Sequence, residues 1–395
     1  MSDPLALIAG WARSAVAPHG GAFRALQPHQ LGAPVLQALL QRAGVPAQAV
    51  DAVVLGNALG AGGNPARMLA LAAGLPESCA AFSIDTQCCS GIDAVSMAVG
   101  LLASGQASVV IAGGIEAWSR APIRQWRPIH AGETAVSYER PAFSPDPSRD
   151  PDLLVSAANY AQQHGFSRAQ QDAYAVLSHQ RAMAHANALA AEIVSVAGLA
   201  HDAYPRVIDL KRAARMPVAV KTAGGDDADR SSGNAGTDCS VSTVAISPKA
   251  DGAALLLLAT ASACNRWGMV PKAAWVGAAS VGGDPGTPLV AAQLAAAAAL
   301  SRASLVGMDS VRVIELHDAF AVQGLSFCQA FGLAPERINR RGGGLARGHP
   351  IGASGAIAMV RLLTDLQADE AMGARGLVAI AGAGGIGAAA VIERL

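Results

Sequence analysis

Cys88 has the sequence surroundings of a reactive thiol. It follows the apolar run 80–87, which predicts a strand, and precedes the run 90–105, which predicts a helix. A helix start directs free backbone N–H groups and positive dipole at nearby side chains, which lowers the pKa of a thiol and favours the nucleophilic thiolate. Cys88 is therefore a candidate nucleophile, expected to be ionised at neutral pH. From position alone, a buried and inert cysteine fits equally well.

Two histidines could act with this thiol. His349 lies in the glycine-rich stretch GGGLARGHPIGASGA (342–356), where glycines let a tight turn present an imidazole. This stretch lacks the GxxxxGK[ST] pattern of a nucleotide phosphate loop. His317 begins the run HDAF (317–320) at the end of a predicted strand, where α/β folds build their sites. The alternatives are a capping or core role for His349 and a helix N-cap for Asp318.

Composition excludes several classes of function. The chain has 395 residues, with 29 basic and 29 acidic side chains. A net charge of zero leaves no electrostatic footprint for nucleic acid or an anionic membrane. The sequence contains no unbroken apolar stretch for a transmembrane helix and begins without the basic region of a secretory signal. Six cysteines without a CxxC pair indicate a cytoplasmic protein, and we predict no metal and no redox cofactor.

The elements that must position these residues alternate along the chain. Short apolar runs between amphipathic stretches predict a mostly parallel sheet with helices on both faces. The expected strands are 5–12, 51–57, 80–87, 107–114, 273–280, 311–320 and 376–385, the last being the final strand. The expected helices are 34–44, 64–74, 90–105, 288–303, 321–332 and 354–368.

This pattern occurs twice. The run DAVVLGN (51–57) matches VRVIELH (311–317) in the register of its apolar residues, and Cys88 and His349 each precede a helix rich in small residues. A repeat of this length predicts two packed halves related by a pseudo-twofold axis. We assign residues 1–117 to the first half, with 251–270 as a connection, and residues 271–395 to the second half.

Residues 118–250 separate the two halves. The segment is rich in proline and contains the polar stretch 221–238. One clear helix is expected at 167–188, with Ser167 as its N-cap. We interpret the segment as an inserted loop domain that covers a site and supplies substrate contacts.

These motifs together resemble the thiolase family, and the likeness covers nearly the whole chain. The stretches that carry it are GNALGAGGNPAR (56–67), QCCSGIDAV (87–95), GGIEAWSRAP (113–122), HDAFAVQ (317–323) and GGGLARGHPIGASGA (342–356). The resemblance implies a duplicated, layered α-β-α-β-α fold with an inserted loop domain. It also implies acyl transfer through an acyl-cysteine formed from a coenzyme A (CoA) thioester.

The resemblance also assigns roles to individual residues. Cys88 corresponds to the family nucleophile and His349 to the histidine that activates it. His317 stands in a His-Asp-x-Phe turn like that of the sterol-carrier-protein type of thiolase. An oxyanion hole would use the backbone N–H groups of Cys88 and Ala383, which require no particular side chain. Ser247 matches a family contact to pantetheine.

Two further substrate contacts are expected, and three family features are absent. Phe320 and Gly348 flank the two histidine turns and are expected to line the substrate site. The second family cysteine, which removes the α-proton of the attacking acetyl group, is replaced by Ala381. The alternative cysteine of the His-Asp-Cys-Phe turn is replaced by Ala319. A family His-Met-Gly stretch that touches substrate reads Asp-Leu-Leu at 152–154.

Three functions remain open from the sequence. The first is a thiolase proper, which performs Claisen condensation or thiolytic cleavage of 3-ketoacyl-CoA with His349 or His317 as the base. The second is a decarboxylative ketosynthase-like or biosynthetic acyltransferase that uses Cys88 and the two histidines. The third is a non-catalytic subunit of thiolase fold, which the retained Cys88 and His349 argue against. Chain length, direction, the replacement base and the carrier (CoA or acyl carrier protein) stay open, as does the choice between homodimer and homotetramer.

Overall fold

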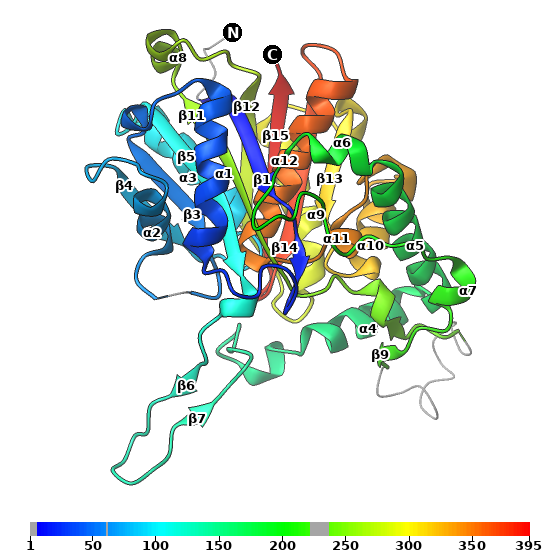
Figure 1. Ribbon diagram of the computed structural model, residues 1–395. Helices are drawn as coiled ribbons and strands as arrows, with labels where there is room; N and C mark the ends of the chain where they lie inside the picture. The colour runs from blue at the N-terminus through cyan, green and yellow to red at the C-terminus, as the bar shows by residue number, and fades with distance from the viewer. Residues whose placement is uncertain (1–5, 61, 222–236) are drawn as a thin grey trace.

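The computed structural model describes residues 6–60, 62–221 and 237–395. Two half-sheets join edge to edge into one sheet of eleven strands (Figure 1). They meet where β1 pairs with β12 through Leu7 opposite Ala274 and Ile8 opposite Ala273. Most of the polar stretch 221–238 lies outside the described residues.

The strand order shows the duplication directly. The first half has the order β4-β3-β5-β11-β1, and the second has β13-β14-β15-β12. Numbered in chain order, the first half reads 3-2-4-5-1 and the second reads 2-3-4-1. The second order is the first with its edge strand, β4, left out and the later strands renumbered, so the second half repeats the first without that strand. The first-half strands are β1 (Leu7–Ser14), β3 (Ala52–Gly56), β4 (Ala80–Ile84), β5 (Val109–Ala117) and β11 (Ala250–Ala259). The second-half strands are β12 (Ala273–Gly282), β13 (Val313–His317), β14 (Arg375–Gly382) and β15 (Ile386–Arg394).

The sheet is mixed, so the expectation of a mostly parallel sheet is wrong. Only β3–β4, β3–β5 and β13–β14 are parallel along the main strand order, and its other pairs are antiparallel. Strands β11 and β15 were not expected, because the sequence pattern indicates a connection at 251–270 and a last strand at 376–385. Strand β15 follows β14 after only residues 383–385, and so short a connection can join only antiparallel strands.

Helices form three layers around the two half-sheets, which confirms the layered α-β-α-β-α fold. Helices α3 (Ser90–Ala103) and α12 (Ile351–Asp369) share one core with the inner faces of both half-sheets. Outside the first half-sheet lie α1 (Pro28–Ala43) and α2 (Pro65–Ala72). Outside the second lie α9 (Ala291–Arg302) and α10 (Ala321–Ala330).

Close packing brings the two central helices together near their starts. A Cβ at Gly91 would lie 2.6 Å from the backbone nitrogen of Ala356, so α3 and α12 can approach this closely only with glycine there. Cys88 lies just before the N-cap of α3, and His349 lies just before the N-cap of α12. This packing therefore places the two candidate catalytic residues near one another.

The segment between β5 and β11 occupies the place that the short 383–385 turn holds in the second half. It contains a projecting hairpin of β6 (Gln125–Trp126) and β7 (Val136–Ser137) (Figure 1). The predicted N-cap Ser167 is confirmed at α5, where its hydroxyl accepts a hydrogen bond from Gln170 N at 3.2 Å. The helices of this segment are α4 (Leu153–His164), α5 (Arg168–Ala184), α6 (Ala186–Ala190) and α7 (Leu210–Ala213). Its other strands are β8 (Ile193–Val194), β9 (Val218–Val220) and β10 (Val241–Ser242).

Buried ion pairs connect the inserted segment to both halves of the molecule. Arg13 of β1 pairs with Glu192 at 2.6 Å and with Asp202 at 2.7 Å, and both carboxylates belong to the inserted segment. Glu192 also pairs with Arg361 of α12, which in turn contacts Asp365. The side chains of this network are excluded from solvent, so each charge depends on its partners for stabilisation.

The remaining elements are short. Strand β2 (Ala17–Pro18) pairs with β11, α8 (Ala261–Trp267) follows β11, and α11 (Gly344–Arg347) precedes His349. None of the helices within the described ranges combines the length and apolar character needed to cross a bilayer.

Candidate active site

Cys88 lies on a tight turn between β4 and α3. Gln87 has a φ of 52°, a left-handed conformation that is strained for a residue with a side chain. The turn is held by Ser90, whose hydroxyl donates to Gln87 O at 2.6 Å and accepts from Thr86 N at 2.9 Å. Asp85 Oδ1 also accepts from Gln87 N at 2.9 Å. The result is a rigid strand–turn–helix corner that presents the sulfur just outside the start of α3.

The structure brings Cys88 and His349 into contact although they are far apart in sequence. The Cys88 Sγ lies 3.1 Å from His349 Nε2. The other ring nitrogen, Nδ1, lies 2.7 Å from the hydroxyl of Ser354, which donates its proton to Pro350 O at 3.1 Å. Because this hydroxyl proton is used, we assign a proton to Nδ1, which leaves Nε2 as the acceptor facing the thiol.

Burial is the main influence on the pKa values of Cys88 and His349 in the absence of substrate. It raises the pKa of Cys88 to about 12, although the backbone N–H groups of Ala383 and Cys88 act in the opposite direction. Burial also lowers the pKa of His349 to about 4. These two shifts favour a neutral thiol beside a neutral imidazole over the thiolate expected from the sequence. Cys88 lies one residue outside the N-cap Cys89, and the helix start does not offset the loss of solvation.

His317 stands beside this pair. Its ring stacks on that of His349, with centroids 4.5 Å apart and an interplanar angle of 28°. The His317 Nε2 is buried and has no hydrogen-bond partner among the residues that the structure describes. Burial, with the neighbouring His349 and Arg347, holds the pKa of His317 well below its usual value. A neutral imidazole with a free Nε2 can donate a hydrogen bond to a substrate oxygen.

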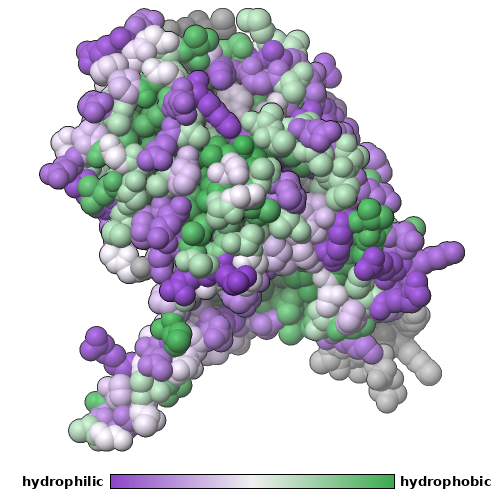
Figure 2. Space-filling view, viewed as in Figure 1, coloured by the Kyte–Doolittle hydropathy of each residue, from purple (hydrophilic) through white to green (hydrophobic). Residues whose placement is uncertain are grey.

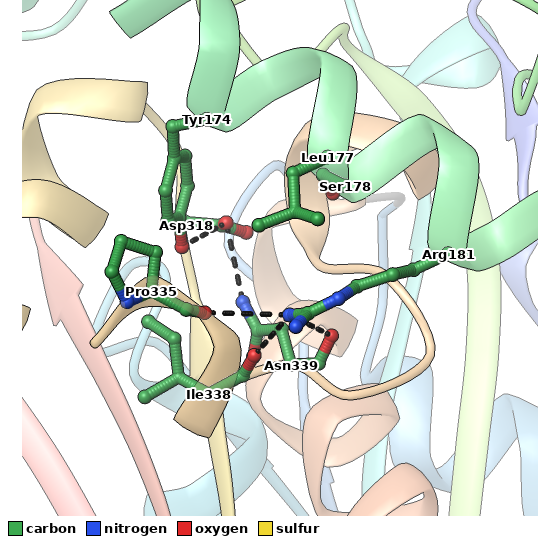
Figure 3. A pocket seen from close by; sticks show the side chains of 8 residues that line it. All are labelled: Tyr174, Leu177, Ser178, Arg181, Asp318, Pro335, Ile338 and Asn339. Atoms are coloured by element: carbon green, nitrogen blue, oxygen red, sulfur yellow. Dashed lines mark hydrogen bonds between the residues drawn. The ribbon is translucent and has the colours of Figure 1, made fainter. Parts of the chain in front are cut away.

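Asp318 is not the helix N-cap that was one alternative, because Phe320 occupies the N-cap position of α10. Its carboxylate instead accepts from the hydroxyl of Tyr174 at 2.9 Å and from Asn339 Nδ2 at 3.2 Å (Figure 3). It also accepts from the backbone N–H of Gly344. A cavity of about 10 Å³ adjoins this carboxylate, enough for about one water molecule. Neither Cys88 nor His317 nor His349 lines it, so it is separate from the candidate active site.

The predicted substrate contacts lie beside the two histidine turns. The Ser247 hydroxyl donates to Gly344 O at 2.6 Å, and its backbone nitrogen donates to Ala319 O at 2.9 Å. The neighbouring residues Ile246 and Lys249 bridge to Phe320 and His349 respectively. Gly348, at a φ of 114°, completes the turn that leads to His349. Contact of Ser247, Phe320 and Gly348 with substrate stays a prediction.

The positions of the absent family residues carry no acid or base. Ala381 lies on β14 opposite Gly387, and the backbone of Ala319 donates to Gln323 Oε1 at 3.0 Å. Cys89 does not substitute for the missing thiol, because its sulfur is buried and faces the backbone oxygen of Ile380 at a distance of 3.8 Å. The residues 152–154 also serve another purpose, since Asp152 Oδ1 accepts from Leu154 N at 2.8 Å and caps α4.

Two residues near the site escaped the sequence analysis. Ser354 orients His349, and Glu116 at the end of β5 accepts from Gly352 N at 2.9 Å. Burial raises the pKa of Glu116 to about 7. The sequence signals that could have identified them were a hydroxyl five residues after His349 and an acidic residue near the end of an apolar run. Within the described ranges, we find no cluster of three or more metal-binding side chains.

The chain is also similar to known proteins over nearly its whole length. Residues 6–262 match the thiolase N-terminal domain, and residues 269–394 match the thiolase C-terminal domain. A Bacillus subtilis protein named putative acetyl-CoA C-acetyltransferase YhfS is 35% identical over 395 residues, which is 99% of each chain. A Thiocystis violacea acetyl-CoA acetyltransferase is 33% identical and covers 100% of each chain.

Two solved structures share the fold over almost the whole chain. The Bacillus anthracis acetyl-CoA acetyltransferase superposes with a TM-score of 0.87 at 28% identity, covering 99% of this chain and 98% of the other. The Ascaris suum Acat5 thiolase, solved in complex with coenzyme A, gives a TM-score of 0.86 at 27% identity and covers 99% and 100% of the two chains. The chain therefore belongs to the thiolase family of acyltransferases.

Proposed function

We propose that the protein transfers an acyl group from an acyl-CoA thioester to Cys88 and then to a second acyl-CoA, or cleaves a 3-ketoacyl-CoA in the reverse direction. The observation that carries this proposal is the 3.1 Å contact between Cys88 Sγ and the acceptor nitrogen of His349. Contact at this distance lets a neutral thiol lose its proton as its sulfur attacks. The homologues named acetyl-CoA acetyltransferase support acetyl-CoA as a donor.

In the first step, Cys88 Sγ bonds to the thioester carbonyl carbon while its proton passes to His349 Nε2. Negative charge develops on the carbonyl oxygen, and the backbone N–H groups of Cys88 and Ala383 form the oxyanion hole. The same two N–H groups act to lower the pKa of the Cys88 thiol, as donors close to the reacting centre would. The tetrahedral intermediate then breaks its bond to the CoA sulfur, which leaves with the proton from His349.

The second step transfers the acyl group to an acceptor. In condensation, His349 or His317 takes a proton from the α-carbon of a second acyl-CoA, and this carbon bonds to the acyl carbon of the acyl-cysteine. The bond from the acyl carbon to Cys88 Sγ breaks, and the sulfur takes up the proton to restore the thiol. Neutral His317 is placed to donate Nε2–H to the acceptor carbonyl, which stabilises the developing enolate. Its low pKa makes it a weak base, so we expect slow α-proton removal in the absence of a cysteine at Ala381 or Ala319.

The proposal also covers the cellular compartment, the area of metabolism, the contact to CoA and the cofactor requirement. We propose a cytoplasmic enzyme of fatty acid metabolism that binds the pantetheine arm of CoA at Ser247 and needs no further cofactor. The six cysteines are all free thiols, in keeping with a reducing compartment. The Ser247 hydroxyl, which donates to Gly344 O, retains lone pairs to accept a pantetheine N–H.

We further propose a homodimer or homotetramer. Strand β4 ends the sheet, and its outer edge is unpaired in the part of the chain that the structure describes. The β6–β7 hairpin stands away from the body with hydrophobic and hydrophilic side chains mixed along it (Figure 2), and Ile123 and Ile129 there are 89% and 87% exposed. Exposed strand edges and exposed apolar side chains favour association with a second copy of the chain. A monomeric mass by light scattering at micromolar concentration would contradict this proposal.

The donor half-reaction tests the function directly. The protein is incubated with acetyl-CoA, and peptide mass spectrometry should show one acetyl group on Cys88 and none on a Cys88→Ala variant. Acceptors are then offered separately: acetyl-CoA, acetoacetyl-CoA with CoA, and malonyl-CoA. Turnover with either of the first two supports the thiolase reaction. Turnover confined to malonyl-CoA would instead establish a decarboxylative enzyme, and acetylation of the Cys88→Ala protein would refute the nucleophile.

A further inference from the structure

The segment that carries His349 is held at both ends by buried carboxylates. At its start, Asp318 accepts the backbone N–H groups of Gly344 and Leu345. At its end, Glu116 accepts the backbone N–H of Gly352 at 2.9 Å. Between these ends, His349 N donates to Pro248 O at 2.7 Å. The imidazole therefore projects from a backbone that is fixed at three points.

Asp318 is itself held in place from two other elements. Tyr174 reaches it from α5, and Asn339 reaches it from the loop before the segment (Figure 3). The exposed fraction of Asp318 is 0%, and burial raises the pKa of its carboxyl to about 6. A carboxylate that accepts several N–H and O–H donors in a solvent-free setting makes strong, directional bonds.

Glu116 connects the two halves of the molecule. It lies on β5, in the half that carries Cys88, whereas Gly352 lies in the first turn of α12, in the half that carries His349. Asn57 Nδ2 donates to its carboxylate at 2.8 Å, and Ala58 N donates at 2.9 Å. This carboxylate therefore ties the half that presents the sulfur to the half that presents the imidazole.

We propose that Glu116 and Asp318 are positioning residues for His349, which set the distance between its Nε2 and the sulfur of Cys88. Asp318 fixes the approach to the imidazole within the second half, and Glu116 fixes the second half against the first. The inference rests on the proposed function, in which His349 takes the proton of Cys88. A displacement near 1 Å at such a contact lowers a reaction rate by about 10²-fold.

The variants Glu116→Gln and Asp318→Asn test the inference. Each keeps the side-chain shape but replaces a carboxylate that accepts backbone N–H bonds with a neutral amide. We expect the rate of Cys88 acetylation by acetyl-CoA to fall at least about tenfold while the Kd for CoA changes little. The matched control is Asp172→Asn, which removes a buried carboxylate bonded to Ser242 on the inserted segment. This control should acetylate at the wild-type rate.

A double-mutant cycle separates positioning from loss of structure. If the carboxylates act through His349, then Glu116→Gln or Asp318→Asn should lower acetylation by less than about twofold in a His349→Ala background. Equal losses in both backgrounds, or wild-type rates in the single variants, would overturn the inference. Wild-type acetylation by His349→Ala would instead refute the proposed function.

Milder variants keep the test available if the first pair fails to fold. Asn57→Ala removes one donor to Glu116, and Tyr174→Phe removes one donor to Asp318. Each should lower the acetylation rate by a smaller factor, of about threefold or more, and this loss should again vanish in the His349→Ala background. Folded variants with unchanged acetylation would overturn the inference.

Discussion

Replacing Gly344 with alanine would press a methyl group against His317. A Cβ at this position would lie 2.7 Å from His317 Cε1, 2.9 Å from Nδ1 and 3.0 Å from Asp318 O. Ordinary contacts of this kind need about 3.5 Å, so the imidazole or the backbone must move by about 0.8 Å. Overpacking on this scale costs about 1–3 kcal/mol of unfolding free energy. A shift near 1 Å at a reacting group costs about 10²-fold in rate.

The assay compares Gly344→Ala with Gly100→Ala. Gly100 lies on the exposed face of α3, and a Cβ added there would have no neighbour within 4 Å, so alanine should stabilise the helix by about 0.5–1 kcal/mol. Unfolding in urea and condensation of acetyl-CoA are measured for both variants. Gly344→Ala should lose activity and stability, and Gly100→Ala should lose neither. Wild-type condensation by Gly344→Ala would refute the role given to the position of His317.

Three further variants probe the site and its framework. Ala381→Cys restores a thiol at the family position and should raise the rate of condensation by about 10²–10⁴-fold, measured as release of CoA from acetyl-CoA; an unchanged rate would show that α-proton removal does not limit the reaction. Ser354→Ala removes the acceptor that fixes the tautomer of His349 and should slow Cys88 acetylation by about tenfold or more, whereas an unaltered burst of CoA release would contradict that assignment. Arg361→Met leaves the buried Glu192 with one cationic partner fewer and should lower the free energy of unfolding in urea by about 3–5 kcal/mol; a loss below about 1 kcal/mol would mean that the network is dispensable.

Much of the architecture follows from local patterns. The repeated register of 51–57 and 311–317 predicts the two halves, and these runs become β3 and β13. The prediction depended on strands that alternate with helices along the chain. Strands β11 and β15 do not follow a crossover helix, so this pattern did not reveal them. Their apolar runs are nevertheless continuous, as expected for strands buried on both faces.

The sequence predicts which residues form the site, but it does not predict their protonation states. Motifs identify Cys88, His349 and His317, and the fold brings them together. Whether the thiol is ionised depends on a balance between burial and nearby N–H groups that only the folded structure reveals. The same limit applies to Glu116, because its partner Gly352 lies in the other half of the chain.

We infer that Cys88 rests as a neutral thiol and passes its proton to a neutral His349 only during acyl transfer. Alkylation of Cys88 by iodoacetamide, followed by mass spectrometry across a range of pH, tests it most directly. Because the pKa of Cys88 is raised to about 12 and that of His349 is lowered to about 4, the rate should climb steadily with pH through the neutral and mildly alkaline range. A plateau that begins near neutral pH and disappears in His349→Ala would reveal a standing thiolate–imidazolium pair and contradict the account.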